Sequence, residues 1–580
     1  MTFYLKMKNE KIAKILFEIG EYLELDNIPF KPRAYQMAAL SIDNLEEDIQ
    51  GIYNEKGIKG VLEIQGVGKG IALKIEEYLK TGKIKYLEEL KRRKTIDVKN
   101  LLKVEGLGPK RISFLNKELG ITNILELKQA IKKNKLKELK GFGEKSQQNI
   151  LESIAFVETS GLRYMLSEVQ KDVSMILEKF KKLKEVEKIE VAGSYRRKKE
   201  TIGDVDILIA SSKPKKIMDE FTSFEGVSRV WGKGKTKTSL RMEKGFNIDL
   251  RVVPLGSFGS ALQYFTGSKE HNVALRRLAI SKGYKLNEYG LFKEGVLKAG
   301  KDEVGIYKKL GLQFIPPELR ENRGEIEAGL KRKIPKLIEL KDIRGDFHTH
   351  SNFAGTLISM EEIVLKAIQK GYEYIGISDH TKALKIENGL DEKELALQAK
   401  EIEKLNKKYR EIRIFHGAEV NILKDGSLDI KNSALKELDF VNIGVHANFK
   451  MKKEEMTERV LKAMSNPYVT CLVHPTGRIV NKREAYDIDL EKIFEFANLR
   501  KILLEVSSSH RLDLNDYNIK RAKEKGCKFL INTDTHMLKH MDRMKYGIYQ
   551  ARRGWLTKKD VINTLPLNKI YGKISRSNNL

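Results

Sequence analysis

A short stretch near the middle of the chain constrains the possible folds more than any other. Asp204 and Asp206 stand one residue apart in an otherwise apolar run that continues to Ile209, which predicts a β-strand. Residues i and i+2 of a strand point to the same face, so the two carboxylates converge. Two unpaired carboxylates side by side repel each other unless a cation lies between them. Mg²⁺ suits such a site because it takes a few carboxylate oxygens and completes its octahedron with water and substrate phosphate.

The residues just before this strand predict an anion-binding turn. Gly193 and Ser194 offer a sharp turn with free backbone N–H groups and a hydroxyl, and Arg196 and Arg197 follow at once. A pair of acids at an exposed strand end is the plain alternative reading of the aspartates. The turn and the two arginines within the same short segment argue against that alternative. The stretch therefore predicts a metal site beside an anion cradle.

A third carboxylate extends this site. Residues 247–254 alternate polar and apolar side chains, as a neighbouring strand does, and this pattern places Asp249 on a polar face. Two ions held by three carboxylates can clamp both the attacking and the leaving oxygen of a phosphoryl transfer. The residues alone thus predict two-metal phosphoryl transfer.

These residues and the run Tyr-Phe-Thr-Gly-Ser at 264–268 resemble a family X DNA polymerase, the nucleotidyltransferase group that includes the repair polymerase beta. The resemblance implies an α+β nucleotidyltransferase palm in which Asp204, Asp206 and Asp249 bind two Mg²⁺ ions. It also implies that Asp249 accepts the proton of the primer 3′-hydroxyl. The residues that it assigns to nucleotide binding are Ser194, Arg197, Gly203, Tyr264, Phe265, Gly267, Asn272 and Arg276.

The resemblance gives these residues separate roles. Ser194 and Arg197 are expected to hold the β- and γ-phosphates of the incoming nucleotide, with Gly203 close by through its backbone. The 264–268 segment is expected to pack under the sugar and to exclude ribose. Asn272 is expected to reach the minor-groove edge of the nucleotide, and Arg276 to touch the template strand. A core aromatic pair before a helix explains Phe265 alone, but not the whole run.

Two positions depart from the pattern of the family. Lys198 stands where a glycine commonly follows the paired arginines, which is tolerable if the residue does not need a positive φ. Asn247 stands where polymerase beta has an arginine that orients the third carboxylate. We expect lower catalytic efficiency from this second change, and not an inactive site.

Three copies of one glycine pattern, apolar-x-Gly-apolar-Gly, follow one another in the first 155 residues. Each copy lies between predicted helices, is followed by lysine and resembles the helix-hairpin-helix motif. Such glycines let the backbone approach a phosphate at a helix N-terminus, a contact that grips DNA without reading its sequence. A plain helix C-cap explains one copy better than it explains three. The glycines assigned to DNA binding are Gly66, Gly68, Gly106, Gly108, Gly141 and Gly143.

The first copy carries a possible second activity. In the polymerase beta type, a domain of this kind can remove a 5′-deoxyribose phosphate through a lysine Schiff base. Lys74 matches that lysine, and Lys31 and Tyr35 match its neighbours, whereas Gly70 replaces a further pocket lysine. A lysine amine needs a lowered pKa to act as a nucleophile, and an exposed helical Lys74 is the alternative.

The histidines are concentrated in the C-terminal part, where nine of the ten lie between residues 348 and 540. His348 and His350 share a strand face, and further polar residues follow at predicted strand ends, as in a (β/α) barrel. This part resembles the PHP phosphoesterase domain, a seven-stranded (β/α) barrel that holds three metals. The ligands implied are His348, His350, His380, Glu419, His446, His474, Asp534 and His536. Mn²⁺ or Zn²⁺ suits such mixed nitrogen and oxygen ligation better than Mg²⁺.

One ligand of the PHP pattern is missing. The family has an aspartate where this chain has Gly355, and that aspartate serves the third ion together with His380 and His536. We expect two firmly held ions and a weak third. The remaining histidines, His416, His510 and His540, have no matching role and are expected at the surface or behind the ligands.

Composition bounds the class of protein. The length of 580 residues predicts several domains. The net charge of +29 favours a polyanionic partner, and the plain alternative is that a lysine-rich proteome raises the charge. Two cysteines exclude a disulfide framework and favour a reducing cytoplasm, and no run predicts a membrane span. The domains expected are a helical N-terminal domain (1–94), a fingers-like helix-hairpin-helix module (95–155), a palm and thumb (156–315), a linker (316–341) and the PHP domain (342–572).

The combined prediction is a monomeric family X polymerase that uses dNTPs to fill short gaps in DNA during repair. Its PHP domain is expected to act as a 3′–5′ exonuclease and, as in some relatives, as an abasic-site endonuclease. One alternative keeps the polymerase but makes the PHP domain structural, because Gly355 replaces a ligand. Another is a non-catalytic DNA-end scaffold, which the intact aspartates disfavour. A small-molecule phosphatase, suggested by the PHP half alone, is disfavoured by the three hairpins.

Overall fold

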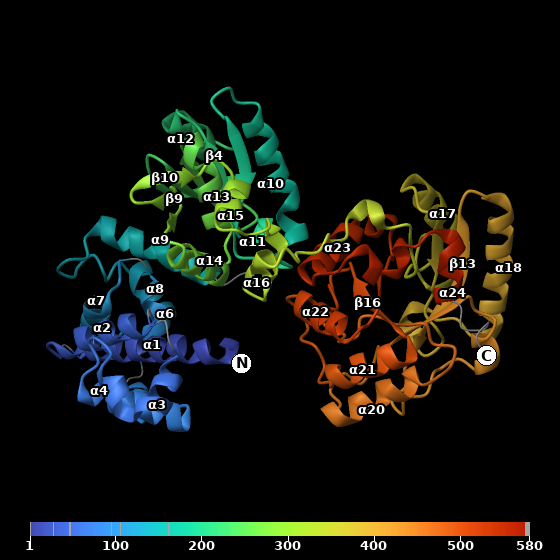
Figure 1. Cartoon of the computed structure of the whole chain (residues 1–580), viewed down its shortest axis with the longest axis horizontal. Coiled ribbons are helices and arrows are strands. Elements are labelled where there is room, and N and C mark those ends of the chain that lie inside the picture. Colours follow the sequence, from blue (N-terminus) through green and yellow to red (C-terminus); the bar gives the residue numbers. More distant parts are fainter. Residues whose placement is uncertain are drawn as a thin grey trace. The chain divides into compact units, whose positions relative to one another are not determined.

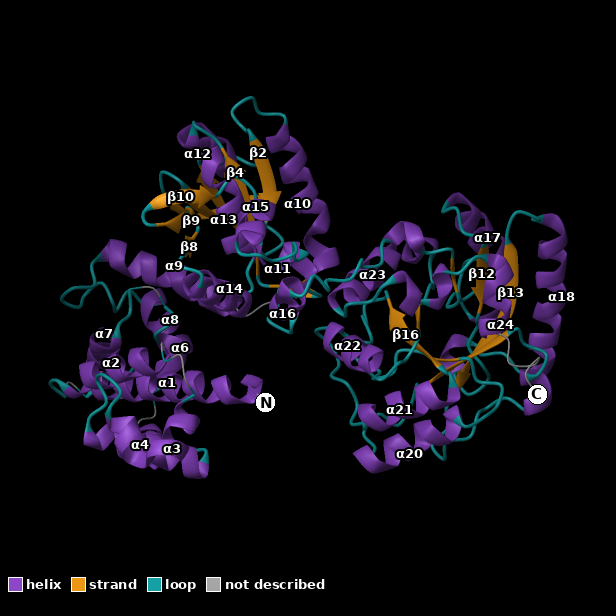
Figure 2. Ribbon diagram, viewed as in Figure 1, coloured by secondary structure: helices purple, strands orange, loops and turns teal. Residues whose placement is uncertain are grey.

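The computed structural model describes residues 2–26, 28–43, 45, 48–93, 96–104, 106–160 and 163–574. The chain divides into two compact units, Met1–Leu162 and Arg163–Leu580. The described part of the first unit is helical, whereas the second unit contains the strands (Figures 1 and 2).

The first unit is a bundle of short helices. Ile12, Leu16 and Ile19 are fully buried on one side of the first helix, as their spacing predicts. The break expected at Pro29 to Pro32 separates that helix from the second. The helices are α1 (Thr2–Leu25), α2 (Lys31–Asp43), α3 (Ile49–Leu62), α4 (Lys69–Thr81), α5 (Lys85–Arg93), α6 (Val98–Leu101), α7 (Pro109–Leu119), α8 (Ile124–Lys132) and α9 (Glu144–Ser160).

The second unit begins with a five-stranded sheet in the order β2-β4-β7-β6-β5. Its strands are β2 (Lys188–Val191), β4 (Asp204–Ala210), β5 (Val227–Lys233), β6 (Lys237–Met242) and β7 (Asn247–Val253). Only the central pair, β4 and β7, runs parallel. Apolar residues of α10 (Leu166–Lys181) and α12 (Pro214–Thr222) pack on one face, and α13 (Phe258–Thr266) packs on the other. The strands β1 (Tyr164–Met165) and β3 (Thr201–Ile202) form a separate antiparallel two-stranded sheet, although α10 and β2 lie between them in sequence.

A smaller subdomain follows the sheet. It comprises α14 (Lys269–Ser281), the antiparallel strands β8 (Lys285–Asn287), β9 (Gly290–Lys293) and β10 (Val296–Ala299), α15 (Glu303–Lys309) and α16 (Glu325–Leu330). Residues 316–341 are not a free linker, because Leu319, Ile326 and Leu337 belong to the buried core of this subdomain. Arg320 within this stretch is fully buried. The expectation of a linker is therefore corrected, and the other domain limits stay predictions.

Seven parallel strands form the C-terminal part, in chain order from β11 to β17. The strands are β11 (Gly345–Asp346), β12 (Tyr374–Ile377), β13 (Arg413–Asn421), β14 (Phe440–Gly444), β15 (Cys471–Leu472), β16 (Leu503–Ser507) and β17 (Phe529–Asn532). Beyond the first and last strands, Thr349 pairs with Thr535, so the sheet is nearly closed. This confirms the predicted seven-stranded barrel.

Helices follow most barrel strands, as expected for repeated strand–helix units. They are α17 (Met360–Gln369), α18 (Glu392–Lys408), α19 (Asn432–Leu435), α20 (Lys453–Met464), α21 (Leu490–Arg500), α22 (Asp516–Glu524), α23 (Met544–Arg553) and α24 (Leu567–Ile574). Aromatic residues including Phe347, Phe415 and Phe440 are buried together with Tyr374. In the described part of the chain, every helix is too short or too polar to cross a lipid bilayer.

Candidate active sites

The first candidate site lies at the start of β4 and β7. In the parallel register, Asp206 stands opposite Asp249, and Asp204 stands opposite Asn247. Along β4, Leu208 and Ala210 pack in the cluster with α13. Because strand residues alternate, both aspartates share that face. The convergence predicted from the i, i+2 spacing is present, and the third carboxylate joins it from the neighbouring strand.

The short helix α11 (Gly193–Arg196) brings the backbone against this cluster. Gly193 has φ +59°, and a Cβ at that position would lie 2.1 Å from Oδ2 of Asp206. The backbone N–H of Ala192 donates to the carbonyl of Asp206 at 2.8 Å. Only glycine allows the turn to approach the carboxylate this closely.

The pKa values of Asp204 and Asp206 are raised in this cluster. Burial, and then the neighbouring Asp204 and Asp249, raise the pKa of Asp206 to about 7. Burial and Asp249 raise the pKa of Asp204 as well. Lys237 offsets part of this repulsion, with its Nζ 3.4 Å from Oδ2 of Asp249. Such a cluster is favourable for a divalent cation, which removes the repulsion.

Replacing Asp206 with asparagine is therefore expected to stabilise the metal-free protein at pH 8, by on the order of 1–3 kcal/mol. The folded-state pKa of Asp206 is about 7, above the ordinary value of 3.8. Between these two pH values the folded protein retains a proton that the unfolded chain has already released. Stability is lost as the pH rises between these two values, and the variant avoids that loss. Thermal unfolding at pH 5 and pH 8 measures the effect. An equal gain at both pH values would contradict the explanation.

The two arginines of the turn have different surroundings. Arg196 forms a bidentate ion pair with Glu303, at 2.9 and 2.7 Å, and fully buried Arg320 donates to the same carboxylate. Arg197 donates from Nε to Glu321 at 2.9 Å and from Nη1 to the carbonyl of Thr266 at 2.5 Å. Arg196 is thus part of the internal support. The phosphate-binding role of Arg197 stays a prediction.

The predicted sugar-binding segment forms the end of α13. The rings of Tyr264 and Phe265 meet edge to face, with centroids 5.2 Å apart. Asn272 donates to the carbonyl of Tyr264 at 2.7 Å, and Gly267 has φ +68° beside the guanidinium of Arg197. Arg276 lies exposed on α14. Ser194 and Gly203 are partly exposed at the same turn and strand end.

The condition under which a lysine at position 198 was expected to be tolerable is not met. Lys198 has φ +54°, so it does occupy the left-handed conformation that glycine adopts without strain. Its ammonium lies 5.2 Å from the ring centre of Tyr195 and 4.9 Å from that of Tyr549. These cation–π contacts help to offset the backbone strain. At the other departure, Asn247 Oδ1 is buried without a hydrogen-bond partner in the described part of the chain.

The second candidate site lies at the carboxyl ends of the barrel strands, around Glu419. Its Oε1 is 2.8 Å from Nε2 of His446 and 2.7 Å from Nε2 of His474. Its Oε2 is 3.1 Å from Nε2 of His348 and 2.9 Å from Nδ1 of His380. Glu419 is therefore shared by most of the predicted ligands. The barrel brings these residues together from five different strand ends.

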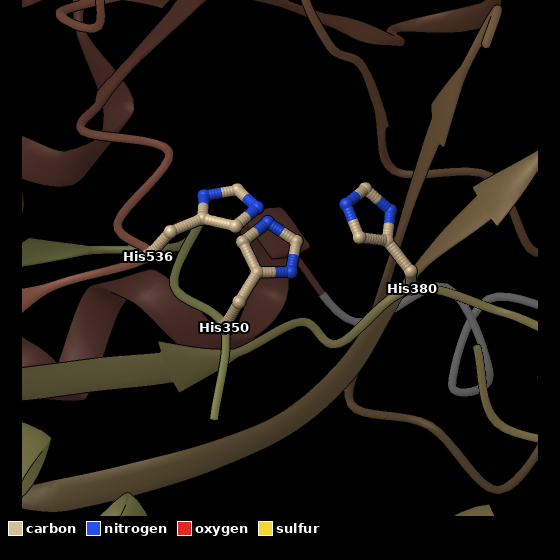
Figure 3. A group of neighbouring side chains, drawn as sticks. All are labelled: His350, His380 and His536. Carbon is tan, nitrogen blue, oxygen red and sulfur yellow. The ribbon is translucent and has the colours of Figure 1, made fainter. Parts of the chain in front are cut away.

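Three groups of neighbouring side chains have donor atoms within reach of one ion: His350 with His380 and His536, His348 with His350 and Glu419, and His380 with Glu419 and His446. Figure 3 shows the imidazoles of the first group turned toward one another. Asp534 adds a carboxylate, since its Oδ1 lies 3.5 Å from Nε2 of His350 and 3.3 Å from Nδ1 of His536.

The buried polar atoms of this cluster fit a metal centre. Ring nitrogens of His348, His350 and His380 and Oε2 of Glu419 are buried without a satisfactory hydrogen bond among the described residues. Burial and the neighbouring His536 hold the pKa of His350 well below its ordinary value, which favours the neutral imidazole that binds metals. Orphaned donors of this kind are expected where an ion belongs.

Glu505 is a functional residue that the sequence analysis missed. It lies on β16, fully buried, and its Oε1 is 2.7 Å from Nδ1 of His348. A carboxylate in this place fixes the tautomer and the orientation of a ligating histidine. An acid inside the apolar run of residues 503–506 is the signal that could have found it.

Gly355 explains why the missing aspartate cannot simply be restored. Its φ is +79°, and a Cβ there would lie 2.8 Å from the carbonyl oxygen of Glu387. Any side chain at this position would be strained and would collide with backbone. The loop around residue 355 therefore differs in shape from one that presents an aspartate.

The metal cluster opens into a cavity of about 420 Å³ whose rim is basic. Arg483, Arg511, Arg543 and His510 line it, and none of them belongs to the predicted ligand set. Cationic side chains at the mouth suit a substrate phosphate. His416 and His540 are both buried, which leaves the second of the two expected places, and Nδ1 of His540 accepts from the backbone N–H of the predicted ligand His536 at 3.3 Å.

The three hairpins of the first unit share one local geometry. Gly66, Gly106 and Gly141 have φ between +83° and +88°, and the second glycine of each pair stands directly before α4, α7 or α9. The predicted lyase residues also belong to this unit. Lys74 Nζ lies 4.8 Å from the ring centre of Tyr86, Tyr35 is buried, and Lys31 begins α2. Burial lowers the pKa of Lys74, and the charge of Lys31 adds to this.

The two sites define a class of protein, a nucleotidyltransferase with a carboxylate cluster fused to a histidine-rich phosphoesterase barrel. Family models match helix-hairpin-helix domains over residues 7–84 and 98–155, the DNA polymerase beta palm over 165–246 and thumb over 261–321, and the PHP domain over 346–509. The chain belongs to the family X DNA polymerases that carry a C-terminal PHP domain.

Relatives agree with this assignment. The chain is 35% identical over 578 residues, 98% of its own length and all of the relative's, to a Bacillus subtilis protein described as DNA polymerase/3′-5′ exonuclease PolX. The chain is also 28% identical over 231 residues to a protein of a Thermoanaerobacter species described as a probable phosphatase. That match covers 38% of this chain and 89% of the relative.

Proposed function

We propose that this protein is a DNA polymerase that fills short gaps with dNTPs during repair and trims 3′ ends with its PHP domain. The observation that carries the proposal is the register of β4 and β7, which places Asp206 opposite Asp249 under the Gly193 turn. The full-length similarity to the B. subtilis protein supports both halves. The helix-hairpin-helix units supply contacts to the DNA backbone. We further propose that the protein acts as a monomer in the cytoplasm.

In the polymerase site, Asp204, Asp206 and Asp249 would hold two Mg²⁺ ions, and these ions would supply charge stabilisation for phosphoryl transfer. Asp249 accepts the proton of the primer 3′-hydroxyl. Ser194 and Arg197 hold the nucleotide phosphates, with the backbone of Gly203 nearby. Tyr264, Phe265 and Gly267 contact the sugar, Asn272 the minor-groove edge and Arg276 the template, as in the family.

In the barrel, the eight predicted ligands would hold Mn²⁺ or Zn²⁺, which would supply an activated water for phosphodiester hydrolysis. Glu505 orients His348, and the arginines that line the cavity bind the substrate phosphates. Two ions would be held firmly and a third weakly, because Gly355 offers no side-chain ligand.

The test uses one gapped substrate and one primer with a mismatched 3′ end. Incorporation of a single dNTP into the gap with Mg²⁺, and shortening of the primer with Mn²⁺, are the expected results. A protein that binds gapped DNA without either reaction would instead be a scaffold.

A structural PHP domain remains the second candidate, and the closed surroundings of Gly355 favour it. The matched comparison uses the Asp204→Ala/Asp206→Ala variant, in which polymerisation is silenced, with and without the further substitution His348→Ala. Primer shortening by the first and not by the second supports the nuclease. Equal inertness, together with an absence of bound Mn²⁺, supports the structural alternative.

Lyase activity gives a separate prediction. If Lys74 is the nucleophile, its lowered pKa allows it to attack the sugar aldehyde, and borohydride then traps the protein on 5′-deoxyribose phosphate DNA. Lys74→Ala is expected to reduce trapping by at least about tenfold. Lys80→Ala, on the same helix, serves as the control. Equal trapping by both variants would contradict the assignment.

A further inference from the structure

The barrel contacts the nucleotide-binding turn directly. Arg553, at the end of α23, donates from Nη1 to the carbonyl of Arg197 at 2.8 Å. On the same helix, the ring centre of Tyr549 lies 4.9 Å from the ammonium of Lys198. Both contacts fall on the two residues that complete the turn after Ser194. A helix of the C-terminal barrel thus supports the part of the polymerase that is assigned to phosphate binding.

Glu321 connects the two arginines through their side chains. Its Oε1 accepts from Nε of Arg197 at 2.9 Å and from Nη1 of Arg553 at 3.0 Å. Arg553 also donates from Nη2 to Asp516 at 2.6 Å. The charges therefore alternate along a chain from Arg197 to Asp516. Only 2% of the Arg553 side chain and 11% of the Glu321 side chain are exposed, so each depends on the other as a partner.

These contacts fix the plane of the Arg197 guanidinium. The bonds from Nε to Glu321 and from Nη1 to the carbonyl of Thr266 use two of its five N–H donors. A Cβ on Gly267 would lie 3.2 Å from Nη1, which shows how closely the segment encloses the group. A guanidinium held in one plane can meet phosphate oxygens in the paired geometry that makes such contacts strong.

We propose that Arg553 is a positioning residue of the polymerase site, and that it orients Arg197 toward the nucleotide phosphates through Glu321. The inference rests on the proposed role of Arg197. It makes the PHP barrel a part of the nucleotide-binding apparatus, independent of any nuclease activity of its own.

A second ion pair holds the other end of the same segment. Arg478 donates to both oxygens of Glu200, at 3.1 and 2.6 Å, and lies four residues after the ligand His474. Residues 197–200 are therefore held by the barrel at both ends. The left-handed Lys198 between them is the position where the family commonly has glycine, and here its side chain is used to contact α23.

The test is single-nucleotide gap filling by Arg553→Met and Glu321→Gln, with the KM for dNTP and kcat measured separately. Each variant is expected to raise KM about tenfold, the effect of losing one hydrogen bond to a charged group, and to leave kcat within about threefold. The double variant is expected to be no worse than either single one, because both act on one chain of contacts. Primer shortening with Mn²⁺ is expected to match wild type in every case.

The matched control is Arg552→Met. Arg552 lies on the same helix and donates to Glu318 at 2.8 Å and to the carbonyl of Ile338 at 2.9 Å, without contact to Arg197. It is expected to lower the melting temperature but not to change KM. An unchanged KM in Glu321→Gln, which keeps the shape of the side chain, would overturn the inference. So would an equal rise in KM for Arg552→Met.

If Arg553→Met does not fold, Arg553→Lys and Glu321→Gln decide the question. Lysine keeps the charge but loses the fork that joins Glu321 to Asp516, so an intermediate KM is expected. A wild-type protein that incorporates no nucleotide would contradict the proposed function itself. Normal incorporation with insensitive variants would contradict only the positioning role.

Discussion

Asp249→Ala is expected to lower the rate of nucleotide incorporation by about 10²–10⁴-fold, the range for removal of a general base. The variant loses the carboxylate opposite Asp206, which is one of the three predicted metal ligands. The measurement is single-turnover gap filling with Mg²⁺, where kcat and not DNA affinity is expected to fall. The nuclease is expected to keep its wild-type rate, because its ligands come from the barrel.

Asp172→Ala provides the control for this loss. Asp172 lies on α10 of the same domain and pairs with Lys244 at 2.8 Å, away from the three carboxylates. It is expected to leave incorporation within about twofold, since surface ion pairs contribute little. Residual incorporation by Asp249→Ala above one tenth of wild type would show that the catalytic ions are held without Asp249.

Glu419→Gln is expected to lower the nuclease rate by at least about 10²-fold and to release bound Mn²⁺. The carboxylate is shared by four histidines, whereas the amide has one weaker oxygen and a nitrogen that repels cations. Metal content after gel filtration and primer shortening with Mn²⁺ are the two measurements. Gap filling by Glu419→Gln is expected to be unchanged. Asp249→Ala and Glu419→Gln should therefore each impair one activity and spare the other.

Asp439→Asn is the matched barrel control. Its carboxylate is partly buried, accepts from the backbone N–H of His416 at 2.8 Å and lies outside the groups of predicted metal ligands. Its metal content is expected to equal that of wild type. If Glu419→Gln retained the full metal complement and the full nuclease rate, the assignment of the cluster as the nuclease centre would be wrong.

Much of both sites could be predicted from local patterns. The spacing of Asp204 and Asp206 and that of His348 and His350 place each pair on one face, since side chains on a strand repeat every two residues. Polar residues at the ends of apolar runs predicted a (β/α) barrel, and its seven strands were implied by the resemblance to the PHP domain. The alternation at 247–254 predicted a neighbouring strand with Asp249 on its polar face, but not the register that places Asp249 opposite Asp206. The register between strands far apart in sequence is not a local property.

What could not be predicted depends on long-range packing or on backbone conformation. Glu505 supports His348 across 157 residues, and Arg553 contacts Arg197 across 356 residues. A lysine in the sequence does not indicate a left-handed backbone, so the backbone strain at Lys198 was not predicted. The expected linker at 316–341 was charge-rich in sequence, yet its apolar residues complete a core.

The contacts of Arg478, Arg552 and Arg553 have a consequence for how such a gene can evolve. Each arginine of the barrel neutralises a glutamate of the polymerase, namely Glu200, Glu318 and Glu321. A gene split near residue 341 would leave Glu200 and Glu318 without these partners, and Glu321 with Arg197 alone. In the other product Arg478 and Arg552 would lose their glutamates, and Arg553 would keep only Asp516. Fission would need several substitutions at once, so the fused gene is expected to persist as one unit of inheritance.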